Sequence, residues 1–221
     1  MNITAVIFDL DGTLVDSSPG ILKAFSGAFS SCGFEPLLPF GPQIIGPPLR
    51  ETLCLLSGSS EVTLLDNLTE AFKSHYDGDG CLQTLPFPGV DEMLRSLHGS
   101  GIRLHIATNK RAFPTGRIIE HLGWRSLFDT VYSLDSFMLQ VSNKARLIAR
   151  LLDDAGLDVS ESVYVGDQHE DALAARQNCL PFLWAAWGYG EQRNISCDGE
   201  DVLLSPDPER FMTSRRHNVD T

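Results

Sequence analysis

The chain has 221 residues, enough for one domain with a sizeable insert or for two small domains. Its composition, 43% hydrophobic and 21% charged, is ordinary for a globular protein. The formal net charge of −12, with no run of Lys or Arg, argues against a surface for nucleic acid or anionic membranes but leaves room for a locally positive site that binds a small anion.

The N-terminus lacks a basic segment followed by a long apolar run, and no apolar run approaches the length of a membrane span. The five cysteines are scattered, and no two of them form a C-x-x-C pair. These features predict reduced thiols in a cytoplasmic protein without a nucleic-acid or membrane partner. They leave the choice between a monomer and a dimer open.

The first predicted strand, ITAVIF at 3–8, runs directly into Asp9 and Asp11. Residues two apart in a strand point to the same side, so the two carboxylates should project together. Like charges this close repel each other, and burial adds to the cost. A shared proton or a bound cation is needed to offset the repulsion.

Residues 17–83 contain no convincing strand and are predicted to form a helical insert. Its helical patterns share apolar residues at helical spacing and lie at 18–33, 47–58 and 61–78. Ser18 as N-cap and Pro19 at the first helical position mark the start of the insert. The stretch LPFPGV, with its prolines and glycine, is expected to return the chain to the main domain.

After the insert, helices and strands alternate. Near-continuous apolar runs, which suit strands buried on both faces, lie at 102–107, 130–134, 162–166 and 181–186. Helical patterns lie at 89–101, 113–123, 142–156 and 170–179. This alternation predicts parallel β-α-β units, and therefore an α/β fold with a doubly wound, mostly parallel sheet and an inserted all-helical segment.

Polar residues follow the ends of these strands. Thr108 and Asn109 follow the second strand, Lys144 follows the third, and GDQHED at 166–171 ends the fourth with further aspartates. Because ligands of open α/β sheets bind beyond the carboxyl ends of the strands, these side chains should meet the two aspartates of the first strand at one edge. That edge would combine a candidate nucleophile, hydroxyl and amide donors, a cation and further carboxylates.

In this order and spacing, the chain resembles the haloacid dehalogenase superfamily, and more narrowly its phosphoglycolate-phosphatase-like branch with a helical cap. The motifs that carry the resemblance are DLDGT at 9–13, TN at 108–109, the lysine at 144 and GDQHED at 166–171, with support from LVDSSPGI, IGPPLRETL, PFPGV and WGYG.

The resemblance reaches to about residue 205 and implies a domain division. Residues 1–16 and 84–205 would form the α/β core, and residues 17–83 the helical cap. Residues 206–221 match nothing and are expected to form a loose tail because they are mostly polar.

The resemblance also implies a phosphoric monoester hydrolase that acts on a small phosphorylated metabolite, such as phosphoglycolate or a sugar phosphate. Asp9 would be the nucleophile that forms an aspartyl-phosphate, and Asp11 would protonate the leaving oxygen and then activate water. Thr108 and Asn109 would bind phosphate oxygens. Lys144 would neutralise charge on the nucleophile and the phosphoryl group.

A Mg²⁺ cofactor is implied by the same resemblance, and it would offset the paired carboxylates. The ion would lie between the Asp9 carboxylate, the Leu10 backbone carbonyl and Asp167, with Asp11 a less favoured direct ligand. Asp171 would hold the ion or its waters from farther away.

The sequence allows more than one role for two basic residues, Arg50 and Lys110. Arg50, in PPLRETL, resembles a cap residue that faces the substrate, but a surface ion pair suits it equally well. Lys110 competes with Lys144 for the electrostatic role. A lysine in the first turn of a helix opposes the helix dipole, and a nearby phosphate with two aspartates would explain its presence, so the role is assigned to Lys144. The lysine motif, SNKARL, lacks the lysine–proline pair common in the family.

The same fold also supports other activities. A phosphomutase of the β-phosphoglucomutase type would carry a catalytic histidine twelve residues after the nucleophile, where this chain has Ile21. Dehalogenases lack the second aspartate, and phosphonate hydrolases have an alanine in place of Asp11. A non-catalytic phosphate-binding module on the same fold remains an alternative.

Overall fold

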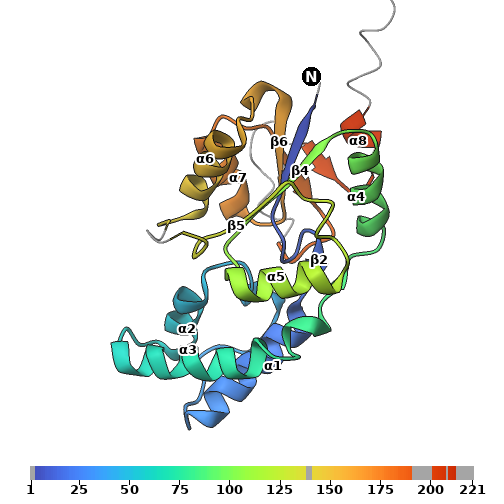
Figure 1. The fold of residues 1–221 in the computed structure, drawn as a ribbon. Helices are drawn as coiled ribbons and strands as arrows, with labels where there is room; N and C mark the ends of the chain where they lie inside the picture. The colour runs from blue at the N-terminus through green and yellow to red at the C-terminus, as the bar shows by residue number, and fades with distance from the viewer. Residues whose placement is uncertain (1–2, 138–140, 191–200, 208, 213–221) are drawn as a thin grey trace, which may run out of the picture.

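The structure is a computed structural model that describes residues 3–137, 141–190, 201–207 and 209–212 (Figure 1). Its main sheet consists of β1 (Ala5–Phe8), β4 (Arg103–Thr108), β5 (Thr130–Ser133), β6 (Ser162–Gly166), β7 (Phe182–Ala185) and β8 (Asp201–Leu203). The strand order is β5-β4-β1-β6-β7-β8, and all neighbours are parallel. The predicted α/β class is confirmed, and β8 is an addition that the sequence did not predict.

Helices cover both faces of this sheet (Figure 1). The core helices are α4 (Val90–Gly99), α5 (Ala112–His121), α6 (Lys144–Ala155), α7 (His169–Gln177) and α8 (Glu209–Met212), with the short 3-10 helix η3 (Val159–Glu161) before β6. Ile7 of β1 packs in one cluster with α6 and α7, whereas Val6 and Phe8 pack in another with α4. Alternate residues of a strand thus fill the two layers, as a doubly wound sheet requires. Within the described residues, none of the helices combines the length and the apolar character needed to cross a membrane.

The insert lies beyond the carboxyl ends of the strands (Figure 1). It contains α1 (Ser18–Ser31), α2 (Leu49–Ser57) and α3 (Val62–Tyr76), with the 3-10 helices η1 (Pro42–Ile44) and η2 (Cys81–Gln83). The short strands β2 (Val15–Asp16) and β3 (Leu85–Pro86) pair antiparallel at its base. This two-stranded ribbon closes the point where the insert leaves and rejoins the core.

Two helices begin differently from their predicted N-caps. In α1 the N-cap is Ser17 instead of Ser18, and its side chain makes no capping hydrogen bond. In α6 the N-cap is Asn143, one residue after the predicted Ser142, and its side chain accepts a hydrogen bond from the Arg146 N–H at 3.0 Å.

The predicted loose tail at 206–221 is partly structured. Phe211 of α8 is buried, and its ring stands edge-on to that of Phe8 with 6.4 Å between the ring centroids. Burial of this aromatic side chain stabilises the docking of α8 against the sheet, because it removes a large apolar area from water. Residues 213–221 lie outside the described residues.

His105 is an unusual polar residue at the centre of the sheet. It lies on β4 opposite Ile7 of β1, is fully buried, and neither ring nitrogen has a hydrogen-bond partner within the described residues. Burial, aided by the charge of Arg103, lowers the pKa of His105 to about 4, although Asp129 opposes the shift. The imidazole is therefore neutral in the folded protein at neutral pH.

We predict that His105 makes the fold acid-sensitive. Between pH 6.5 and about 4, His105 is protonated in the unfolded chain but neutral in the folded protein. The free energy of unfolding therefore falls as the pH is lowered. Replacing His105 by leucine should remove on the order of 2–3 kcal/mol of this loss between pH 7 and pH 4. Urea unfolding at both pH values measures it, and parallel losses in the two proteins would contradict the prediction.

Candidate active site

The site forms where the three central strands end at one level. Phe8 of β1 pairs with Ile106 of β4 and with Val165 of β6, so the residues that follow these strands emerge side by side. Gly12 turns the chain at φ +86°, and a side chain there would collide with the carboxylate of Asp167. The glycine of DLDGT is therefore required both for the turn and for the close approach.

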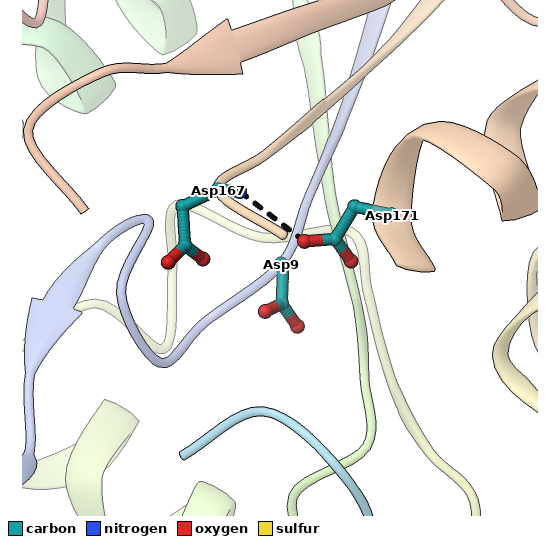
Figure 2. A group of neighbouring side chains, drawn as sticks. All are labelled: Asp9, Asp167 and Asp171. Atoms are coloured by element: carbon teal, nitrogen blue, oxygen red, sulfur yellow. Dashed lines mark hydrogen bonds between the residues drawn. The ribbon is translucent and has the colours of Figure 1, made fainter. Parts of the chain in front are cut away.

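Asp9, Asp167 and Asp171 converge at this edge (Figure 2). One carboxylate oxygen from each lies within 4.8 Å of the others, and all three residues are buried. Oδ1 of Asp9 accepts no hydrogen bond from any described residue. A buried group of hard oxygen donors with an unpartnered oxygen suits a divalent cation such as Mg²⁺ or Mn²⁺.

Electrostatics supports the same interpretation. Burial raises the pKa of Asp9, and Asp171 and Asp11 add to the shift while Lys144 opposes it. Burial also raises the pKa of Asp167, reinforced by Asp171 and Asp9. Without a cation these carboxyl groups retain protons that ordinary aspartates have lost, and a bound cation would take their place.

The Asp167 carboxylate is held rigidly from several sides. Its Oδ2 accepts hydrogen bonds from the backbone N–H groups of Tyr189 and Gly190 at 2.8 and 3.3 Å and from Nε2 of Gln168 at 3.1 Å. Its Oδ1 accepts one from the Thr13 hydroxyl at 3.2 Å. This orientation is fixed before any ligand binds.

Asp171 is committed to structural contacts. Its Oδ2 accepts hydrogen bonds from the backbone N–H groups of Asp167 and Gln168, just before α7. Its Oδ1 accepts hydrogen bonds from Lys144 Nζ at 2.5 Å and from the Tyr164 hydroxyl at 3.4 Å. These contacts suit the indirect role that the resemblance implied for Asp171 better than direct metal ligation.

Lys144 is buried between two of the aspartates. Its Nζ lies 3.2 Å from Oδ1 of Asp9 and 2.5 Å from Oδ1 of Asp171. Burial alone would lower its pKa, but Asp171 and Asp9 raise it well above the ordinary value. Lys144, the first residue of α6, thus holds a permanent positive charge beside Asp9, the predicted nucleophile. It does so although the proline that commonly follows this lysine in the family is absent.

Leu10 does not suit the metal-ligand role that the resemblance implied. Its carbonyl oxygen accepts hydrogen bonds from the backbone N–H groups of Thr13, Leu14 and Val15, at 3.3, 2.9 and 3.1 Å. A carbonyl oxygen has two lone pairs, and these three donors already occupy them. The tight turn after β1 directs this carbonyl into its own backbone.

Asp11 is held apart from the acidic cluster. The Ser17 hydroxyl donates to its Oδ1 at 2.5 Å, and Lys110 Nζ donates to its two oxygens at 3.0 and 2.9 Å. Lys110 also donates to the hydroxyl of Tyr76, at the end of α3, at 2.7 Å. Asp11 is therefore positioned by core and insert together, and these contacts leave it a poor metal ligand.

Thr108 and Asn109 lie at the end of β4, both buried. Thr108 Oγ1 accepts the Lys110 N–H at 3.2 Å. Nδ2 of Asn109 donates to the Gly46 carbonyl of the insert at 3.0 Å and to Glu170 at 3.1 Å, while its Oδ1 has no partner within the described residues. Asn109 therefore joins the core to the insert beside Asp11.

Arg50 lies away from this site. It pairs with Asp66 of α3 at 2.6 Å, and the two side chains are 48% and 59% exposed. It also does not line the cavity that lies between the insert and the core with Asp11 in its wall. The structure thus has the surface ion pair, and such an exposed pair contributes little to stability.

Several contacts were not predicted from the sequence, namely those of Ser17, Tyr76, Lys110 and Tyr189. A signal for Tyr189 was present in the glycines of WGYG, because a side chain at Gly188 or Gly190 would collide with Asp167. The contacts of Ser17 and Tyr76 depend on where the insert lies against the core, and no local pattern encodes that.

The chain is similar to proteins of known families. The sequence model of the haloacid dehalogenase-like hydrolase family matches residues 6–185. A phosphoglycolate phosphatase of Agrobacterium fabrum is 30% identical over 89% of this chain and 86% of its own. A 5'-nucleotidase of Pseudomonas aeruginosa is 29% identical over 86% of each chain.

A solved structure of a haloacid dehalogenase-like family hydrolase from Streptococcus pneumoniae has a TM-score of 0.82 with 28% identity. The match covers 97% of this chain and 99% of that one. The similarity therefore extends over the helical insert as well as the core.

We predict that a divalent cation stabilises the fold more at high pH. In chelator, the folded carboxyls of Asp9 and Asp167 keep protons that the unfolded chain loses, so stability falls as the pH rises above the ordinary carboxyl range. Magnesium chloride should therefore raise the melting temperature more at pH 8 than at pH 5.

Asp167→Asn should reduce the cation-induced shift at pH 8, whereas Asp153→Asn on the exposed surface of α6 should not. Scanning calorimetry with and without cation measures both. Equal shifts at the two pH values would show that the cluster does not bind the cation.

Proposed function

Because the chain belongs to the haloacid dehalogenase-like hydrolase family and is a phosphoric monoester hydrolase, we propose that it is a Mg²⁺-dependent phosphatase of a small phosphorylated metabolite that works through an aspartyl-phosphate. The observation that carries the proposal is Oδ1 of Asp9, which accepts no hydrogen bond and is ion-paired at 3.2 Å with a buried lysine in a group of aspartates. The described cysteines are all free, which supports a cytoplasmic location.

Asp9 has the features of a nucleophile. Its Oδ1 accepts no hydrogen bond, so a lone pair is available to attack phosphorus. The positive charge of Lys144 lies beside the same oxygen and would neutralise the negative charge that accumulates as Asp9 and the phosphoryl group approach. Attack forms a bond from Asp9 oxygen to phosphorus and breaks the bond to the leaving oxygen.

Asp9 and Asp167 are the residues that would hold Mg²⁺, with Asp171 supporting them through Lys144 and the start of α7. The ion would supply positive charge that lets a phosphate dianion enter a buried group of carboxylates. This small, hard ion keeps several waters and needs few protein ligands. The carboxylates of Asp9 and Asp167 are therefore sufficient as protein ligands for the ion.

Asp11 is the residue that we propose moves the proton. In the first half of the reaction it would give a proton to the leaving oxygen. In the second half it would take one from the water that attacks the aspartyl-phosphate, which returns Asp9 to a carboxylate and releases phosphate. Ser17 and Lys110 fix both Asp11 oxygens, so the carboxyl group is oriented before substrate binds.

Thr108 and Asn109 are proposed to contact the phosphate oxygens. They stand at the end of β4 beside the nucleophile, and Asn109 also binds the insert through the Gly46 carbonyl. A phosphate that engages Asn109 would therefore bind where insert and core meet. The insert would act as a cap that excludes water from the reaction.

A phosphomutase remains the second candidate from the family, but the structure offers it no support at residue 21. Ile21 is buried and lines the cavity beside Asp11, where the mutase histidine would act. An apolar side chain there cannot transfer a proton, and this favours water over a second hydroxyl group as the acceptor of the phosphoryl group.

We predict that Asp9→Asn abolishes phosphate release. The neutral amide is nearly isosteric, so circular dichroism should report an unchanged fold while the nucleophile is lost. Asp153→Asn on the surface should retain full activity. Turnover of p-nitrophenyl phosphate with Mg²⁺ is the measurement, and substantial residual activity in Asp9→Asn would exclude Asp9 as the nucleophile.

We predict that Lys144→Ala is more damaging than Lys110→Ala. Lys144 contacts the attacking residue, and its loss should cost on the order of 10²-fold or more in turnover. Lys110 contacts Asp11, which Ser17 continues to hold, so its loss should cost much less. Both variants are assayed at saturating Mg²⁺, and the reverse order would contradict the assignment of Lys144.

A further inference from the structure

A cavity between the insert and the core opens directly onto Asp11. Its walls are more apolar than polar and come mainly from α1, the η1 segment, α2, α3 and α5, with Ile21, Phe25, Ile44, Leu49, Phe72 and Pro114 as the apolar contributors. Thr52, Tyr76 and Asn109 add uncharged polar groups. The rings of Phe25 and Phe72 lie 4.6 Å apart between centroids and form one continuous apolar surface. The group that accepts a proton from Asp11 would extend into this cavity.

The positive charges at this cavity are already compensated. Of the described residues, only Lys110 and Arg111 bring a cation to its lining. Lys110 Nζ donates to both oxygens of Asp11 and to the Tyr76 hydroxyl, which uses all three of its N–H groups. The Arg111 guanidinium makes a two-pronged ion pair with the carboxylate of Asp77, at the end of α3.

An anionic leaving group would therefore be poorly bound here. A carboxylate that entered the cavity would lose its water against aliphatic and aromatic walls, and it would have to compete with Asp11 or Asp77 for a cation. An alkyl group in the same place would gain from burial and disturb neither ion pair.

Resting on the proposed function, we propose that the substrate is the phosphate monoester of an uncharged alcohol with an apolar carbon skeleton, and not of a hydroxy acid such as glycolate. When the bond from phosphorus to the leaving oxygen breaks, that oxygen takes the proton of Asp11. The product is a neutral alcohol that rests against the apolar walls, and hydrolysis of the aspartyl-phosphate then releases phosphate.

Isobutyl phosphate and phosphoglycolate test the proposal, because the branched alkyl group and the carboxymethyl group have nearly the same shape and differ in charge. With wild-type enzyme and Mg²⁺, kcat/KM should be at least tenfold higher for isobutyl phosphate. An equal or higher value for phosphoglycolate overturns the proposal. Activity on p-nitrophenyl phosphate shows whether the enzyme is a phosphatase at all, and its absence together with inactivity on both esters would overturn the proposed function as well.

Substitutions of two leucines on α2 test whether the substrate preference arises in the cavity. Leu49→Lys adds an uncompensated cation to the wall, and it should shift the ratio of the two kcat/KM values at least tenfold toward phosphoglycolate. Leu55→Lys adds the same charge on the same helix at a side chain that is 57% exposed and outside the cavity, and it should leave the ratio unchanged. An unchanged ratio in both variants would show that the leaving group binds elsewhere, and the wild-type comparison stands even if a variant fails to fold.

Discussion

The burial of three carboxylates at the ends of adjacent parallel strands is the constraint on which the rest of the site depends. Asp9, Asp167 and Asp171 lie within 4.8 Å of one another with almost no solvent, and only Lys144 compensates them within the described residues. The core rigidly orients Asp167 and Asp171, whereas Oδ1 of Asp9 has the ion pair with Lys144 but accepts no hydrogen bond. A cation is the ligand that this excess of negative charge favours, and a bound cation would in turn allow a phosphate to approach.

The second charged group, around Asp11, serves a different purpose. Lys110 binds Asp11 and Tyr76 at once, and Asn109 binds the Gly46 carbonyl on the other side of the cavity. Both contacts join the core to the insert, so the position of the insert and the position of Asp11, the proposed proton-transfer group, are linked. Under the proposed function, the core would supply the phosphoryl chemistry, and the insert would supply the walls that the leaving group meets.

Much of this arrangement could be predicted from the sequence, because it depends on local patterns. Apolar runs, glycines and the spacing of DLDGT, TN, Lys144 and GDQHED predicted the parallel sheet, the insert and the meeting of their side chains at one edge. The features that the sequence did not predict have physical causes. The direction of the Leu10 carbonyl depends on the geometry of one turn, and the docking of Phe211 depends on a distant sheet face. The ion pairs of Arg50 and Lys110 depend on how helices of the insert lie in space. Fold likeness does not fix the substrate either, since relatives with the same fold carry different activities in their names.

The central claim is that Asp9 carries the phosphoryl group during turnover, and trapping that group tests it most directly. The enzyme would be quenched in acid during turnover of p-nitrophenyl phosphate, reduced with borohydride, which converts an aspartyl-phosphate to homoserine, and mapped by peptide mass spectrometry. The account predicts homoserine at Asp9 and unmodified aspartate at Asp11, Asp167 and Asp171. Modification of another aspartate, or none at all while phosphate is being released, would contradict it.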